Sequence, residues 1–168
     1  YGKYLLEANM RVDGSSKFLP GSQYGYFPSV AAGWRFTEEN FIRDKTENWL
    51  NSGKLRVSYG SLGNNSGIGR YEQQATLATN NYIINGVVQR GFVNTKMVNE
   101  NLTWETSTVL NIGLDLTFLR NRLTTSIDFY SRKTTDMEQP SNLSTLLSGA
   151  YSPAPNTNVG DMLNRGVE

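Results

Sequence analysis

The sequence of 168 residues contains no cysteine and no histidine. Without cysteine the chain can form no disulfide, and it offers neither a thiolate nucleophile nor a zinc-thiolate site. Without histidine it lacks the most common general base and cannot build a Ser-His-Asp triad. Most catalytic constellations are therefore excluded, while serine with lysine or paired carboxylates stay formally open. We expect no catalytic residue, no metal site and no cofactor.

Long apolar runs and an excess of one charge are also missing. No stretch approaches the roughly 18 consecutive apolar residues of a transmembrane helix. Sixteen basic residues balance fifteen acidic ones, and no basic run could follow a phosphate backbone, so we expect no nucleic-acid partner. The chain is instead rich in residues that favour strands, among them nine tyrosines and seven phenylalanines.

Residues 106–131 alternate with the period of a β-hairpin around a short turn at 119–122. Parity places Phe118 opposite Leu123 and Leu114 opposite Ile127. One face of this hairpin is mostly apolar and carries Leu110, Ile112, Leu114, Leu116, Phe118, Leu123, Ile127 and Phe129. The opposite face is polar and carries Asn111, Asp115, Ser126 and Asp128.

Strand length separates two readings of this two-faced hairpin. The rows run for about ten residues, which is the length of a strand that crosses a bilayer, whereas strands of globular sheets usually have about five or six. The pattern favours an all-β fold, the antiparallel wall of a transmembrane barrel, with the apolar row facing lipid and the polar row lining the lumen. The alternative is a soluble carbohydrate-binding β-sandwich or adhesin module, in which the apolar row would be buried.

Other segments extend this wall to about six strands. Alternation predicts strands at 3–12, 28–37 and 54–61, a short helical turn within 38–51, and long loops at 13–27, 62–104 and 136–157. All three loops fall at the end opposite the 119–122 turn, and outer-membrane barrels have short periplasmic turns and long external loops.

Six strands cannot close even the smallest barrels, which have about eight. We therefore expect this chain to be part of a larger barrel. Both ends of the sequence also look like cuts. The sequence begins at Tyr1 with neither a methionine nor a signal peptide, and its final residues resemble a turn followed by the start of a strand.

Several short blocks, in this order and spacing, resemble the SusC/RagA family of TonB-linked outer-membrane transporters across most of the chain. Glu100 departs from the family pattern, which more often has proline there. The blocks are Asp13-Gly14-Ser15-Ser16-Lys17-Phe18, Tyr24-Gly25-Tyr26-Phe27-Pro28-Ser29-Val30 with Gly33-Trp34, Lys54-Leu55-Arg56-Val57-Ser58-Tyr59-Gly60 with Gly63-Asn64, Asn101-Leu102-Thr103-Trp104-Glu105, Asn111-Ile112-Gly113-Leu114-Asp115, Asn121-Arg122-Leu123 and Asn164-Arg165-Gly166-Val167-Glu168.

The resemblance implies that residues 1–168 are part of a TonB-dependent receptor barrel domain of about 22 strands. The plug, the TonB box and the other strands have no counterpart here. It further implies import of a glycan oligosaccharide, or in some members a peptide, across the outer membrane of a Gram-negative cell. A SusD-like surface lipoprotein would act as a lid, and the TonB complex would supply energy.

The long loop at 62–104 is the best candidate for contact with the lipoprotein or the substrate, through Tyr71, Tyr82 and Arg90. Tyr24 and Tyr26 could stack on sugar rings, although anchoring at a membrane interface is at least as good a reading.

Asp115 and Asp128 are diagonal neighbours in the expected register, which leaves a paired-carboxylate hydrolase formally open. Lumen carboxylates are more often solvated or paired with a basic residue such as Arg122.

Overall fold

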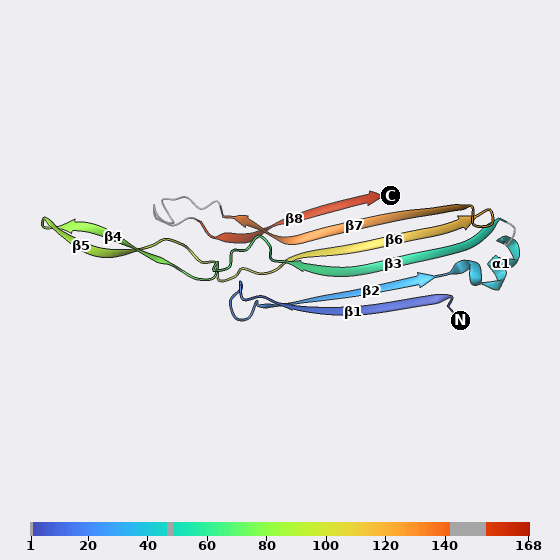
Figure 1. Cartoon of the computed structure of the whole chain (residues 1–168), viewed down its shortest axis with the longest axis horizontal. Helices are drawn as coiled ribbons and strands as arrows, with labels where there is room; N and C mark the ends of the chain where they lie inside the picture. Colours follow the sequence, from blue (N-terminus) through green and yellow to red (C-terminus); the bar gives the residue numbers. More distant parts are fainter. Residues whose placement is uncertain (1, 47–48, 142–153) are drawn as a thin grey trace.

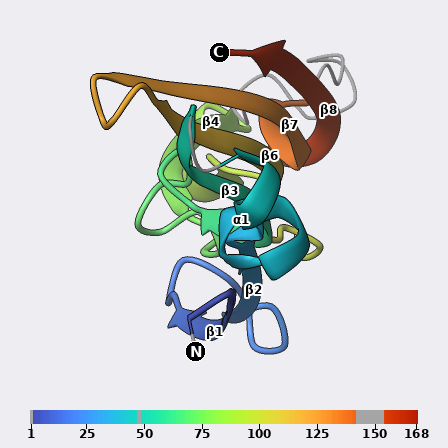
Figure 2. The same cartoon turned by 90° about the vertical axis from the view of Figure 1, so that its right-hand side faces the viewer.

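The computed structural model describes residues 2–46, 49–141 and 154–168. Six antiparallel strands form one sheet in the order β1-β2-β3-β6-β7-β8. Their bounds are β1 Tyr4–Gly14, β2 Tyr24–Trp34, β3 Leu50–Asn64, β6 Glu105–Phe118, β7 Leu123–Pro140 and β8 Asn156–Val167. Figure 1 shows them running side by side as one elongated sheet, and Figure 2 shows from the α1 end that the sheet is a single curved layer.

The expected asymmetry of the two ends is confirmed. The β6–β7 turn lies at one end of the sheet, together with the 3-10 turn η1 (Phe36–Glu38) and the helix α1 (Asn40–Thr46). At the other end lie the β1–β2 loop and the long excursion between β3 and β6 (Figure 1). We call these the turn end and the loop end. No helix in the described part of the chain is both long enough and apolar enough to span a membrane.

The hairpin register predicted from parity is confirmed. Phe118 pairs with Leu123, Leu116 with Thr125 and Leu114 with Ile127. The turn between the strands holds three successive non-glycine residues at positive φ, from Leu119 to Asn121. Such a turn is costly on its own. Two hydrogen bonds to residues around the start of β3 hold it: Leu119 N donates to Trp49 O at 3.2 Å, and Arg120 N donates to Asn51 Oδ1 at 2.8 Å.

Several predicted boundaries were wrong, in most places because pairing continues where local composition suggests a loop. β2 begins at Tyr24 rather than at residue 28, since Tyr24 and Tyr26 pair with Gly14 and Val12. It ends at Trp34 rather than at residue 37, because Phe36 begins the η1 turn. The short helix expected within 38–51 is confirmed as α1, and β3 begins at residue 50 rather than at residue 54. The third loop is also shorter than 136–157: β7 continues to residue 140 and β8 begins at residue 156, while residues 142–153 lie outside the described part.

The loop expected at 62–104 contains a second sheet that the sequence analysis missed. β4 (Leu77–Ile84) and β5 (Val87–Asn94) form a two-stranded ribbon, which extends beyond the main sheet at the loop end (Figure 1). Its turn is Asn85-Gly86, with both residues at positive φ. Asn-Gly between two apolar runs is the strongest short hairpin signal, so the sequence did contain the information.

The sheet exposes its apolar face instead of burying it. Cross-strand partners extend the predicted row through Leu55, Val57 and Tyr59 of β3 to Val30 of β2 and the even positions of β1. Many of these side chains are exposed, up to 86% for Leu6. No second sheet or helix covers this face in the described ranges, which argues against a sandwich that buries the row.

Candidate functional site

The polar face carries a charged network across β3, β6 and β7. The Arg56 guanidinium donates from Nε to Asp115 Oδ2 at 2.7 Å and from Nη2 to Asp115 Oδ1 at 3.0 Å. Its Nη2 also donates to both oxygens of Asp128 at 3.2 Å. Ser126 Oγ lies 2.8 Å from Asp115 Oδ1. One cation therefore links two carboxylates on neighbouring strands.

Gly113 explains why Arg56 can reach across a whole strand. In the register, Gly113 pairs with Arg56 on one side and with Asp128 on the other. A Cβ at this position would lie 2.6 Å from both Arg56 Nη2 and Asp128 Oδ1. Because glycine has no side chain, the Arg56 guanidinium has room to cross β6 at this position.

The diagonal placement of Asp115 and Asp128 agrees with the expected register, but Arg122 is not the base that pairs with them. Arg122 lies in the turn just before β7, whereas Asp128 is well inside that strand. The partner is Arg56, which is 59 residues from Asp115 in sequence. Both carboxylates accept hydrogen bonds from the same guanidinium, an arrangement suited to fixing strands rather than to acid–base chemistry.

Replacing Arg56 with methionine should destabilise the full barrel by about 1–2 kcal/mol, because two carboxylates then face each other without a cation. The loss is smaller than for a fully buried pair because water screens these side chains, which are between 24% and 37% exposed. Urea unfolding of the refolded transporter measures it. Adding Asp128→Asn to Arg56→Met should recover part of the loss; an Arg56→Met variant as stable as the parent would contradict the network's role.

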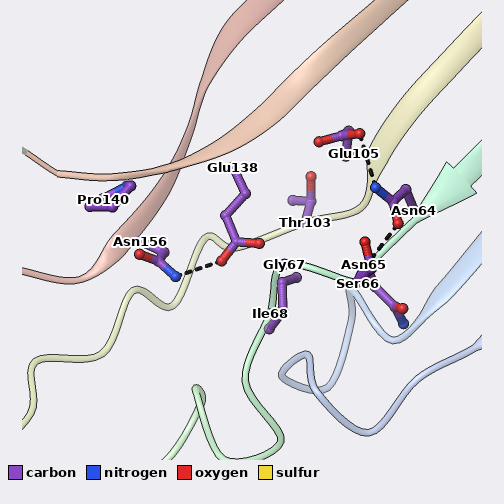
Figure 3. Close-up of a pocket in the computed structure, with 10 residues that line it drawn as sticks. All are labelled: Asn64, Asn65, Ser66, Gly67, Ile68, Thr103, Glu105, Glu138, Pro140 and Asn156. Atoms are coloured by element: carbon purple, nitrogen blue, oxygen red, sulfur yellow. Dashed lines mark hydrogen bonds between the residues drawn. The ribbon is translucent and has the colours of Figure 1, made fainter.

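A hollow of about 410 Å³ opens at the loop end, between the end of β3 and the ends of β7 and β8 (Figure 3). Glu138 Oε1 accepts a 2.6 Å hydrogen bond from Asn156 Nδ2, and Glu105 Oε1 accepts one of 3.1 Å from Asn64 Nδ2. Amides, carboxylates and hydroxyls dominate the lining, which consists of Asn64, Asn65, Ser66, Gly67, Ile68, Thr103, Glu105, Glu138, Pro140 and Asn156.

Glu138 lies beyond the bulge of β7, at the loop end of the sheet. Partial burial raises the pKa of its carboxyl above the ordinary value, and the nearby Glu72 and Glu105 raise it further, although the Asn156 hydrogen bond opposes this. The hollow presents amide groups that donate hydrogen bonds and carboxylates that accept them. In the described ranges, no three acidic residues lie close enough to hold a metal ion.

A small hydrophobic core, which was not predicted from the sequence, ties together the loops at the loop end. Phe18 of the β1–β2 loop is 1% exposed and packs with Ile68 and Leu102, which come from the two loops flanking the ribbon. The Trp104 ring lies 5.0 Å from Phe18 and 5.8 Å from Phe27 between centroids. Residues 18, 27, 102 and 104 all belong to the blocks that carry the family resemblance, which was the available signal.

The predicted contact residues do not meet at one point. Tyr82 and Arg90 both lie in the ribbon, but on opposite faces, since Tyr82 pairs with Gln89 and packs over Gly91. Tyr71 lies at the base of the ribbon, where its carbonyl accepts a 3.2 Å hydrogen bond from Lys96 Nζ.

Tyr24 and Tyr26 are placed on the apolar face. Their partners are Gly14 and Val12 of β1, and both rings are exposed. Gly25, which lies between them in the sequence, is on the polar face. The hollow at the loop end does not include either tyrosine.

A curved single-layer sheet with an exposed apolar face, a charged polar face and, in the described part of the chain, its long loops at one end defines a segment of a transmembrane β-barrel wall. Residues 1–168 match the family described as TonB dependent receptor-like, beta-barrel. The chain belongs to this family.

Relatives confirm the resemblance to SusC/RagA proteins. The chain is 39% identical over 166 residues to TonB-dependent receptor P3 of Formosa agariphila, and 37% identical over 174 residues to TonB-dependent receptor SusC of Bacteroides thetaiotaomicron. Each alignment covers 99% of this chain but 16% of the relative, so the chain spans about one sixth of their length.

Solved structures agree with this assignment. The RagAB peptide importer in its open-open state superposes with a TM-score of 0.82 at 32% identity, covering 99% of this chain and 17% of that one. The RagAB peptide transporter gives a TM-score of 0.79 at 32% identity, covering 98% and 17%.

Proposed function

We propose that residues 1–168 form part of the barrel wall of a TonB-dependent transporter in the outer membrane of a Gram-negative cell. The exposed apolar face carries this proposal. Side chains such as Leu6, Ile112 and Phe129 would be unfavourable in water but suit lipid. The outer edges of β1 and β8 are unpaired in the described sheet, and strands outside this chain would complete the barrel.

Each face then has an assigned environment. The row from Leu110 to Phe118 and its β7 counterpart face lipid, while Asn111, Asp115, Ser126 and Asp128 line the lumen. Aromatic side chains lie toward both ends of the apolar face. Trp34 and Trp49, which stacks on the half-buried Phe118, are exposed at the turn end, and Tyr24, Tyr26 and Tyr59 are exposed toward the loop end. Two aromatic belts are typical of interfacial anchoring, so we assign Tyr24 and Tyr26 to anchoring rather than to sugar stacking.

The transported substrate would be a nutrient oligomer, a glycan or a peptide, admitted with a SusD-like lipoprotein and driven by the TonB complex through regions outside this chain. Similarity to SusC and to the RagAB peptide importer supports this class. The polar hollow at the loop end lies where an entering oligomer would first meet the wall, and its amides and carboxylates suit hydroxyl or peptide groups.

The ribbon is the proposed contact with the lipoprotein. A two-stranded hairpin is marginally stable alone in water, yet this one exposes apolar side chains on both faces, including Ile83, Val88 and Phe92 on one and Tyr82 and Ile84 on the other. Contiguous exposed apolar surface marks protein-binding sites.

Excising the ribbon tests this contact cleanly. Thr76 and Thr95 already meet at its base, where Thr95 N donates to Thr76 O at 2.9 Å, so residues 77–94 can be replaced by a two-residue Asn-Gly turn. Ile68 and the loop core stay in place. In the full transporter we expect lipoprotein affinity to fall by about tenfold or more, the scale of losing an interface hot spot, with a matching loss of uptake.

Point variants complete the experiment. Tyr82→Ala and Arg90→Ala should each weaken co-purification of the lipoprotein, whereas Phe41→Ala, an exposed aromatic at the turn end, should not. Unchanged lipoprotein association and uptake after excision would refute the assignment of the ribbon.

A further inference from the structure

The apolar face carries a small charged patch on β7 and β8. Arg165 pairs with Ser131, and its Nε lies 3.3 Å from Ser131 Oγ. Lys133, two residues further along β7, forms a 3.1 Å ion pair with Asp161. These side chains share the side of Phe129 and Val167, which pair with each other one step closer to the turn end. From β1 to the bulge of β7, the described strands carry no other charged side chain on this face.

Their position along the strands marks a polar boundary. A lysine or arginine on the lipid face costs about 2–4 kcal/mol at the bilayer midplane and nearly nothing at the interface. In the register, Ser131 pairs with Leu110, and Leu110 pairs with Tyr59. Beyond this level toward the loops, the face on β3 and β6 changes from leucine, isoleucine and tyrosine to Ser61 and Thr108, which pair with each other. The patch therefore lies where the external lipid headgroups would begin.

The charges of the patch do not balance. Asp161 neutralises Lys133, whereas on the β7 side of Arg165 the described residues place no carboxylate within ion-pair distance, and Arg165 Nε donates a hydrogen bond to Ser131 Oγ there. The net charge of the three residues is positive, on a surface that would otherwise meet only lipid. A guanidinium presents forked donors that match two phosphate oxygens.

We propose that Arg165, assisted by Lys133, binds the phosphate of a lipid headgroup in the external leaflet. This inference rests on the proposed function, which gives the face its lipid contact and the loop end its external orientation. The ligand is a lipid that carries both a phosphate and acyl chains. The two cations would contact the phosphate, and the neighbouring Val167 and Phe129 would contact the acyl chains.

The test uses the full transporter in neutral detergent micelles, titrated with phosphatidic acid or with diacylglycerol of the same chains, and native mass spectrometry counts bound lipid. Arg165→Gln should weaken phosphatidic acid binding about fivefold, the effect of about 1 kcal/mol for one basic residue. Asp161→Asn should strengthen binding, because it removes the competing carboxylate. Arg132→Gln, adjacent in sequence but on the polar face, should leave it unchanged.

Three results would overturn the proposal: equal binding of diacylglycerol, equal effects of Arg165→Gln and Arg132→Gln, or displacement of the lipid by inorganic phosphate at the same concentration, which would indicate a site for free phosphate. Failure of the proposed function is distinguishable from these results. If the transporter inserts into bilayers and imports its substrate but does not bind phosphatidic acid, only the headgroup site is refuted.

Discussion

Replacing Leu114 with arginine should destabilise the assembled barrel by about 2–4 kcal/mol, the cost of a basic side chain on the lipid face near the bilayer centre. Leu114 pairs with Leu55 on one side and Ile127 on the other, so the position lies in an aliphatic row across three strands. In the described strands the carboxylate on this face is Asp161, which lies beyond Ser131 toward the loop end, so an arginine at position 114 would have no carboxylate nearby. Urea-dependent refolding of the full transporter into lipid vesicles measures the loss.

Val109→Arg is the matched control, since it also places arginine at an apolar position of β6. Val109 faces the polar side, where it borders a hollow shared with Asn111 and Asp128, and an arginine there would remain in water. Its effect should stay within about 0.5 kcal/mol, as for other surface changes. Equal losses for Leu114→Arg and Val109→Arg would show that neither face meets lipid, and would restore the soluble sandwich.

Replacing Phe18 with alanine should remove about 3–5 kcal/mol from the packing of the external loops, because it empties the centre of their shared core. Phe18 is 1% exposed and contacts segments that flank both sides of the ribbon. Since the six-stranded ladder does not depend on it, the loss should appear as local opening of the loops. Limited proteolysis of the full transporter in vesicles, followed by mapping of the cut sites, measures this opening.

Phe92→Ala provides the control, being the same substitution at a ring that is 66% exposed. It should leave the cleavage rate of the loops close to the parental rate, whereas Phe18→Ala should accelerate it strongly. If both variants were cut at the same rate, the loop core would have no role in holding the loops together.

How far the fold could be foreseen varied with the distance between partners in the chain. The β6–β7 pairing was predictable because a short turn leaves parity as the only variable. The start of β2 was missed because Gly, Ser and Pro near residues 20–28 resemble a loop, while pairing with β1 overrides that composition. The ribbon was missed although Asn85-Gly86 marked it.

The basic partner of the two carboxylates was predicted wrongly for a similar reason. Asp115 and Asp128 were assigned to the polar face, but their partner was sought nearby at Arg122. Arg56 became visible only from the β3–β6 register, together with Gly113, which lets it pass.

The alternation of apolar and polar residues was enough to specify which side chains share a face, because successive residues of a strand point to opposite sides whatever the strand pairs with. The order of loops and turns likewise specified which end carries the long connections. The folded chain was needed to show which distant groups meet: Arg56 with Asp115, Phe18 with Ile68 and Leu102, and Arg165 with Ser131. Those contacts depend on cross-strand register and loop packing between segments far apart in sequence, which local periodicity does not encode.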